Sequence, residues 1–143
     1  MTHRFHGCKG GGLLVAALAA ALVLTGCAAP EEQTLRLDIR DGVLRAAGAE
    51  CGGGGSFRPL HPTAAYEIVG PDGEVVAGGE LPQGTAEKSF TPDFGELLEP
   101  TACRMEFTVS GVSELDGYAI RVDGHPDIRI IQSDDEIPTA VVP

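Results

Sequence analysis

The chain has no Trp and little positive charge. Among its 143 residues, aromatic side chains make up 5%, and 10 Lys and Arg stand against 21 Asp and Glu, for a formal net charge of −11. Because nucleic-acid binders need a basic surface to neutralise phosphates, this balance predicts no nucleic-acid partner. The scarcity of aromatic residues also disfavours a large apolar pocket for a ligand.

The sequence also lacks the arrangements that are typical of enzymes and metal sites. No Ser lies in a Gly-x-Ser-x-Gly turn, and no Lys follows the glycine run at residues 52–55 as a phosphate-binding loop requires. Ser133, His125 and Asp127 are close along the chain, but catalytic groups are brought together by the fold and not by sequence proximity. We predict no catalytic residue, no cofactor and no metal ligand, and we interpret residues 134–136 as part of a solvated acidic tail.

The first residues have the pattern of a secretory signal peptide. Arg4 and Lys9 supply positive charge, and an uncharged apolar run follows at residues 13–24. A basic start, a short apolar run that forms a helix, and small residues at a cut site are typical of such a signal. An uncleaved membrane anchor is the alternative, although the run is shorter than the roughly 20 residues that a spanning helix needs.

The apolar run ends in Leu24-Thr25-Gly26-Cys27, which resembles the lipobox of bacterial membrane lipoproteins. The resemblance implies cleavage between Gly26 and Cys27 and a diacylglyceryl lipid on the Cys27 thiol. It also implies that the protein is held on the extracytoplasmic face of the cell membrane, since two acyl chains on one Cys anchor a protein stably. The other interpretation is an ordinary signal peptide cut elsewhere, with Cys27 incidental.

Such processing divides the chain into four parts. These are the signal peptide at 1–26, the lipidated Cys and its tether at 27–34, a folded domain at 35–133, and an acidic and apolar C-terminal tail at 134–143. Cleavage would leave 8 basic and 21 acidic residues, a net charge of −13. An anionic membrane surface repels such a domain, so we expect the lipid rather than surface adsorption to hold it. We expect a monomer.

Cys51 and Cys103 are the two cysteines left after processing and lipidation. An even pair in an oxidising compartment predicts a disulfide between them. The closed loop of about 50 residues would stabilise the fold by about 4 kcal/mol through the entropy of the unfolded chain. Two free thiols or a metal pair are the alternatives, but a metal site needs more ligands at short spacing than His61 and His125 offer.

Apolar and polar residues alternate with a period of two in the folded domain, which indicates strands. The clearest alternation lies at residues 35–40, 103–109 and 118–123. About seven short strands separated by turn residues predict an all-β fold. We expect a small antiparallel β-sandwich of immunoglobulin-like or transthyretin-like type, preceded by the signal-peptide helix.

Turn residues suggest how these strands connect. Asp41-Gly42 is a two-residue hairpin signal, and the hairpin would place Asp38 opposite Arg45 as a cross-strand ion pair. The segment Gly52-Gly53-Gly54-Gly55-Ser56 predicts a flexible loop without regular structure. Residues 81–100 are rich in Pro, Gly and acidic residues and predict a long loop.

The folded part resembles small secreted or lipid-anchored β-domains of high-GC Gram-positive bacteria. The resemblance rests on a Cys followed by glycines, a Pro-Asp-Gly-Glu-Val turn, a Cys-x-Met-x-Phe-x-Val strand and a Tyr-x-Ile-x-Val strand. Arg58 follows Phe57 at a position where that group often has Asp. The group implies no general function.

The glycine segment leads directly to Phe57 and Arg58, and binding residues are often found on loops. We predict that these two residues contact a partner. The acidic domain favours a basic or neutral partner, either an envelope protein or a small ligand. The function indicated is a lipid-anchored, extracytoplasmic binding or accessory module of the cell envelope without catalysis. A ligand-carrying or ligand-sensing β-sandwich is the alternative, and an envelope hydrolase is a more distant one.

Overall fold

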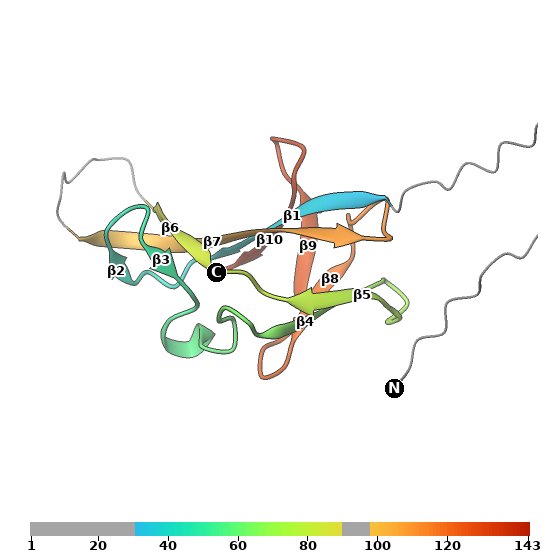
Figure 1. Cartoon of the computed structure of the whole chain (residues 1–143), viewed down its shortest axis with the longest axis horizontal. Helices are drawn as coiled ribbons and strands as arrows, with labels where there is room; N and C mark the ends of the chain where they lie inside the picture. The colour runs from blue at the N-terminus through green and yellow to red at the C-terminus, as the bar shows by residue number, and fades with distance from the viewer. Residues whose placement is uncertain (1–30, 90–97) are drawn as a thin grey trace, which may run out of the picture.

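The computed structural model describes residues 31–89 and 98–143, and these residues form an almost entirely β-structured domain (Figure 1). They contain ten strands and one short 3₁₀ helix, η1 (Gly55–Phe57). In chain order the strands are β1 (Glu32–Ile39), β2 (Leu44–Arg45), β3 (Glu50–Cys51), β4 (Ala65–Val69), β5 (Val75–Glu80), β6 (Gly84–Lys88), β7 (Glu99–Ser110), β8 (Ala119–Val122), β9 (Ile128–Gln132) and β10 (Pro138–Val142).

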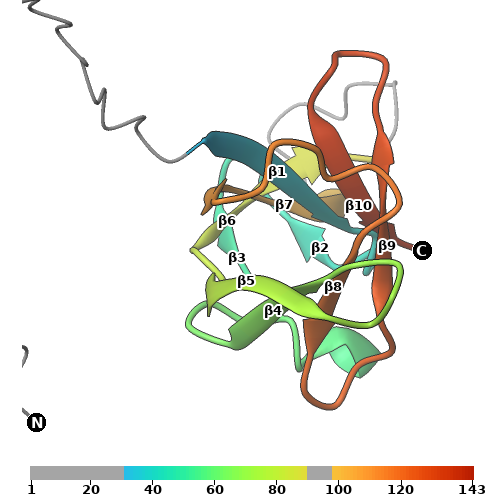
Figure 2. The same cartoon turned by 90° about the vertical axis from the view of Figure 1, so that its right-hand side faces the viewer.

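The strands belong to one curled, mixed sheet. Its order is β3-β6-β7-β1-β10-β9-β8-β4-β5, with β2 paired to β7 beside this path. β1 and β10 are parallel, whereas the other pairs are antiparallel. Figure 2 shows the sheet curling so that β4 and β5 face β1 and β7 across the core. The predicted all-β class is confirmed, but the purely antiparallel sandwich of about seven strands is not.

The described residues form ten strands where the sequence predicts about seven, and this difference has a physical explanation. The expected hairpin already includes β2, whereas β3 contains only two residues, too few for an alternating pattern to show in the sequence. β6 lies in the segment that predicts a long loop, and its first residue, Gly84, has no side chain to contribute to a pattern. β7, with 12 residues, is long enough to pair with both β2 and β6, and β3 in turn pairs with β6.

The core is built on the predicted alternation of β1 and β7. Leu35, Leu37 and Ile39 have no exposed surface, and Leu37 lies opposite Met105 in the register with β7. Burying a side chain of this size stabilises the fold by roughly 1.5–3 kcal/mol. The other face of β1 carries Arg36 and Asp38, which face outward because side chains of a strand alternate between its two faces.

The expected hairpin at Asp41-Gly42 is wrong. β1 pairs with β7 and β10, and Asp38 forms its ion pair with Arg104 at 2.8 Å instead of with Arg45. β2 pairs with the start of β7, where Leu44 lies opposite Pro100. β7 gives β1 a partner along eight residue pairs, which buries far more of the apolar face of β1 than a short hairpin could.

The C-terminal strand β10 lies inside the sheet, between β1 and β9. The sequence predicts a tail from residue 134, yet Thr139, Ala140 and Val142 are buried. A strand covered on both faces is a continuous apolar run rather than an alternating one, so the period-two pattern is missing from this segment. β1 likewise begins at Glu32, inside the segment assigned to the tether.

The predicted disulfide joins Cys51 of β3 to Cys103 of β7. Their Cα atoms are 5.8 Å apart, and both residues are buried. A Cβ atom at Gly84 would lie 2.5 Å from the Cys103 sulfur, so glycine is needed where β6 passes between the two cysteine-bearing strands. The bridge therefore fixes one edge of the sheet, β3 and β6, to the central strand β7.

Candidate partner-binding site

The glycine segment after Cys51 forms a compact loop that ends in η1. Gly53 N–H donates to Leu60 O at 2.8 Å, Phe57 N–H donates to Gly54 O at 2.9 Å, and Leu60 N–H donates to Phe57 O at 2.9 Å. These bonds close the backbone on itself around Phe57. The expectation of a flexible loop without regular structure is wrong, because the backbone groups of this segment are bonded in a defined pattern.

Close packing, and not flexibility, explains the glycines. A Cβ atom on Gly53 would lie 2.0 Å from Phe57 O, and one on Gly54 would lie 2.6 Å from a methyl group of Val43. A Cβ atom on Gly52 would lie 2.8 Å from the Pro62 ring. Each distance is too short for a real side chain, so the segment needs glycine wherever neighbouring chain presses against it.

An ion pair between Asp41 and Arg45 holds this loop in place. Arg45 Nη1 donates to Asp41 Oδ1 at 2.9 Å, and Arg45 Nη2 donates to Asp41 Oδ2 at 2.7 Å. The Asp41 side chain is fully buried, and that of Arg45 is 13% exposed. Gly54 N–H also donates to Asp41 Oδ2 at 2.8 Å, which ties the glycine loop to the end of β1.

The surroundings of Asp41 favour its charged form. Burial alone raises the pKa of this carboxyl group, because it removes water from the charge. Hydrogen bonds from Arg45 and from the backbone N–H groups of Val43 and Gly54 outweigh burial, so the pKa of Asp41 lies below its ordinary value. Asp41 therefore remains an acceptor for these donors at neutral pH.

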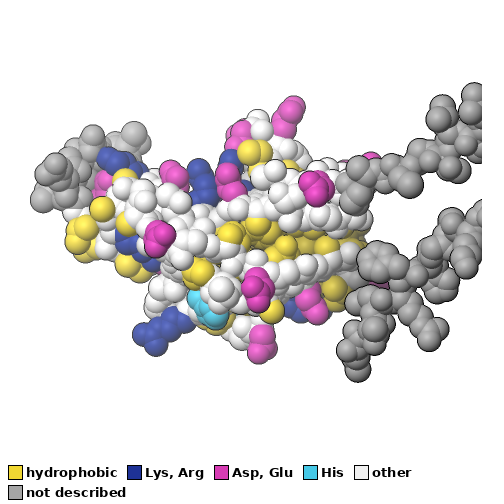
Figure 3. All heavy atoms as spheres, in the orientation of Figure 1, with side chains coloured by type: hydrophobic (Ala, Val, Ile, Leu, Met, Phe, Trp, Pro, Cys, Tyr) yellow, Lys and Arg dark blue, Asp and Glu magenta, His cyan; other side chains and the backbone are white. Residues whose placement is uncertain are grey.

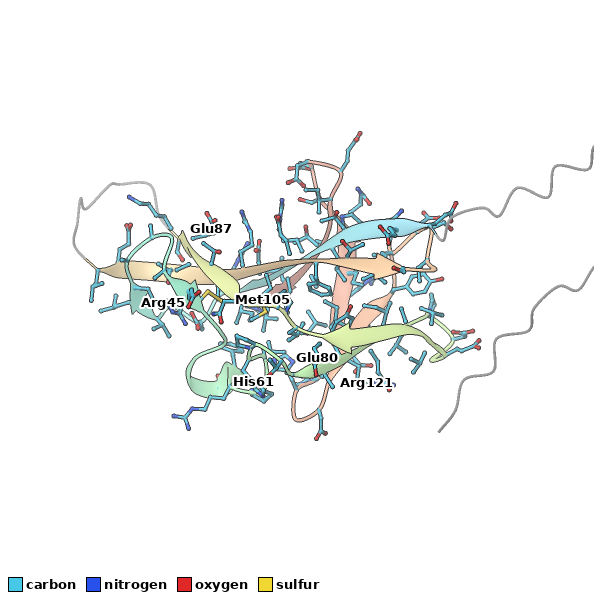
Figure 4. All side chains as sticks on the ribbon, in the orientation of Figure 1. Arg45, His61, Glu80, Glu87, Met105 and Arg121 are labelled. Carbon is cyan, nitrogen blue, oxygen red and sulfur yellow. A yellow bond between two sulfur atoms is a disulfide. The ribbon has the colours of Figure 1, made fainter. Side chains whose placement is uncertain are left out.

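Arg45 links the loop to two further elements. Its Nη2 donates to Gly52 O at 3.1 Å, and its Nη1 donates to Thr101 Oγ1 of β7 at 3.1 Å. The Thr101 hydroxyl in turn donates to Val43 O at 3.0 Å. Figure 4 shows Arg45 close to β2 and β3, whereas His61 lies below it, near η1. The sequence analysis missed the roles of Asp41 and Arg45, because it placed both residues in a hairpin and interpreted the glycine run as a flexible loop.

The two predicted contact residues lie on the outside of this loop. Phe57 is half-buried against the core, and its ring centroid lies 6.2 Å from that of His125 in the turn between β8 and β9. Arg58 is exposed. We refer to Phe57, Arg58 and His125 as the Phe57 patch. The structure thus brings His125 to the predicted pair from a distant part of the sequence.

Most of the basic residues that the structure describes pair with a carboxylate, and Arg58 does not. Arg36, Arg45, Arg104 and Arg121 each bond to a carboxylate, and Lys88 lies 3.3 Å from Glu99. Within residues 31–89 and 98–143, no carboxylate pairs with Arg40, Arg58 or Arg129. Of these three, Arg58 is the one that follows a half-buried aromatic residue, so its charge is available to a partner at that point.

The residues weighed for catalysis have separate positions and partners. Asp127 bonds to Arg121 at 2.9 and 3.0 Å, which lowers the pKa of the Asp127 carboxyl group. His125 Nδ1 lies 2.7 Å from Pro126 O, and Ser133 follows the far end of β9. The structure does not bring these three residues together as a nucleophile and base.

The acidic segment that follows β9 is attached to β1. Arg36 Nη1 donates to Asp135 Oδ2 at 2.6 Å, and Asp135 also bonds to Ser133. These bonds lower the pKa of Asp135. In the described part of the chain, no three His, Cys, Asp or Glu residues are grouped closely enough to hold a metal ion.

The predicted lipidation and cleavage residues, Cys27 and Gly26, lie outside the described residues. Among the residues described, no helix has the length and apolar character needed to cross a membrane. Comparisons with protein-family models, with curated proteins and with solved structures found no match to this chain. Fold and site together define an acidic, disulfide-linked β-domain that carries an aromatic and basic patch on a tightly bonded loop.

Proposed function

We propose that this protein is a lipid-anchored binding or accessory module of the cell envelope, held on the extracytoplasmic face of the membrane through Cys27 and acting without catalysis. The lipobox-like sequence that ends at Cys27 supports the anchor. The disulfide between Cys51 and Cys103 is consistent with an oxidising, extracytoplasmic location. The Phe57 patch is the part of the domain that we assign to partner binding.

One observation carries the binding proposal: the exposed Arg58 stands beside the half-buried Phe57 on a loop held by the buried Asp41–Arg45 pair. Aromatic and Arg side chains contribute much of the binding energy in protein interfaces. A loop that is already ordered loses little conformational entropy when it binds. A partner that is basic or neutral overall but has one acidic group beside an apolar surface would fit this patch, because Arg58 has no carboxylate of its own in the described structure.

Intact mass and lipid labelling test the anchor. The protein extracted from membranes should begin at Cys27 and carry acyl groups, and Cys27→Ala should lose both lipid label and membrane retention. Cys8→Ala is the matched control and should keep both, because Cys8 lies in the segment removed with the signal. Membrane retention of Cys27→Ala without lipid would contradict the anchor and point to an uncleaved signal segment.

Crosslinking in intact cells tests the patch. A crosslinked envelope protein should be recovered with the wild type and lost with Phe57→Ala and with Arg58→Glu. Arg129→Glu is the matched control, since Arg129 is also exposed and without a carboxylate partner in the described structure but lies on β9. Equal recovery with Arg58→Glu and Arg129→Glu would remove the Phe57 patch from the interface.

A further inference from the structure

Two strand edges face each other without pairing on one side of the domain. β5 is the last strand in the sheet order and pairs only with β4. β6 pairs with β7 at residues 101–104, so among the strands of residues 31–89 and 98–143 only β1 pairs with residues 106–110. β5 and β7 approach each other closely at a few residues without pairing. We call the side of the domain formed by residues 75–79 of β5 and 106–110 of β7 the β5–β7 seam, and Figure 1 shows the two strands running in opposite directions along it.

The backbone of β5 has hydrogen-bonding groups available at this seam. Leu81 N–H donates to Ala64 O at 2.9 Å, and alternate residues of an antiparallel ladder bond to the same neighbour. By this alternation Gly79 and Ala77 bond toward β4, whereas Gly78 directs its N–H and C=O away from β4. Gly78 and Gly79 also have no side chains that would hinder an approaching strand.

Apolar side chains line the seam. Phe107 of β7 is only partly buried, and its ring centroid lies 4.8 Å from that of Tyr66 beneath β5. At one end, Val76 and Tyr118 line a surface groove together with Val112. Figure 3 shows an apolar band along this side of the molecule with acidic side chains on both sides of it. An apolar band beside two open strand edges is a surface that an added strand could cover.

The charge around the seam selects a basic partner. Residues 59–87 and 105–120, which include both edges, contain eight acidic residues and no Lys or Arg, and two of the eight, Glu67 and Glu106, pair with Arg121 and Arg36. Glu74 and Glu80 are exposed at the two ends of β5. Pairing with the same edge of a second copy would bring these like charges together, so the acidic surroundings favour a partner of opposite sign over self-association.

β5 lacks some of the features that keep edge strands from pairing, although its pairing with β4 has an irregularity in register between Ile68 and Val69. Natural edges are usually very short or carry Lys or Pro. β3, at the other end of the sheet, contains only two residues, whereas β5 has six and contains neither Lys nor Pro. Val75 and Val76 of β5 are 48% and 41% exposed. We propose that the β5–β7 seam binds an extended, positively charged segment of a partner protein, which adds to the sheet as a further strand; this proposal does not depend on the Phe57 patch.

Peptide binding to the isotope-labelled, purified full chain tests the proposal. The probe is a synthetic ten-residue peptide of alternating Lys and Val, and a peptide of alternating Asp and Val is its charge-reversed control. The Lys–Val peptide should shift the amide resonances of β5 and of residues 106–110 and should slow hydrogen exchange at Gly78. The Asp–Val peptide should cause neither change, and added salt should weaken binding of the Lys–Val peptide.

Two matched variants separate strand addition from simple charge attraction. Val76→Lys should weaken binding by about tenfold, because it places a like charge in the seam. Ile131→Lys introduces the same charge at a similarly exposed position on β9 (48% against 41% for Val76) and should leave binding within about twofold of wild type. Equal loss in both variants, resonance shifts spread over the whole surface, or no binding would overturn the proposal. Pairing of β5 with a second copy in preference to the peptide would overturn it as well.

Discussion

The Arg45 guanidinium of β2 binds both oxygens of the Asp41 carboxylate, at 2.9 and 2.7 Å, and the two residues are four positions apart in the sequence. Asp41 accepts a further bond from Gly54, and Arg45 donates to Gly52 and Thr101. The pair thus connects the end of β1, the glycine loop and β7. The position of the Phe57 patch depends on this one buried ion pair.

Removing the carboxylate should destabilise the domain. Asp41→Ala leaves the Arg45 charge and the Gly54 N–H without their acceptor, and losing one partner of a buried pair costs about 3 kcal/mol in the free energy of unfolding. Denaturant unfolding at neutral pH measures this cost. Asp123→Ala removes an exposed carboxylate and should change stability by less than about 0.5 kcal/mol.

The same carboxylate should make stability depend on pH. The pKa of folded Asp41 lies below its unfolded value of about 3.9, so its stabilising contribution is fully present above that pH. The contribution is lost as the pH falls through the lower, folded pKa. Wild type should therefore lose more stability than Asp41→Ala between about pH 5 and pH 2. Parallel pH profiles for the two proteins would contradict the role of Asp41.

The glycine loop should tolerate a methyl group only where space exists. Gly53→Ala places Cβ 2.0 Å from Phe57 O, and the resulting displacement of backbone should lower the unfolding free energy by about 3 kcal/mol. Gly55→Ala meets no neighbour within 4 Å but has a φ of +58°, which costs about 1 kcal/mol. Thermal or denaturant unfolding of the two variants gives the comparison. A smaller loss for Gly53→Ala than for Gly55→Ala would show that the loop is loosely packed.

Cys51 and Cys103 should stabilise the fold only when they are oxidised to the disulfide. Cys103→Ser opens a loop whose ends are 52 residues apart, and the entropy gained by the unfolded chain lowers stability by about 4 kcal/mol. Reductant should lower the wild-type melting temperature toward that of the variant and leave the variant unchanged. A wild-type melting temperature that does not respond to reductant would count against the bridge.

The buried side chains of β10 should be required for the stability of the fold. Ala140 of β10 has no exposed surface, so Ala140→Asn buries an amide without a partner and should cost about 2 kcal/mol or more. Val141 points to the other face of the same strand and is only partly buried, so Val141→Asn should cost much less. Unfolding curves of both variants test this difference. Equal, small losses would mean that this segment behaves as a dispensable tail.

Local features of the sequence were sufficient for several correct predictions. The alternation at residues 35–40 and 103–109 identifies β1 and the main part of β7, because the buried face of a strand must be apolar. The pair of cysteines predicts the bridge, because only two remain after the proposed processing. The alternating pattern also predicts the all-β class. That Phe57 and Arg58 contact a partner stays a prediction from their position after the glycines, and the approach of His125 to Phe57 is seen only in the structure.

The remaining features depend on contacts between distant residues. The apolar area that each arrangement buries decides whether β1 pairs with β2 or with β7. A short segment of sequence does not reveal this area, because it depends on contacts between residues far apart in the chain. The glycine run reads as a flexible loop until Val43, Phe57 and Pro62 are seen pressed against it. β10 shows no alternation because both its faces are covered. The sequence by itself determined the all-β class, the long alternating strands and the bridge, whereas long-range packing in the tertiary structure decided the short strands, the position of β10, the strand pairing and the order of the glycine loop.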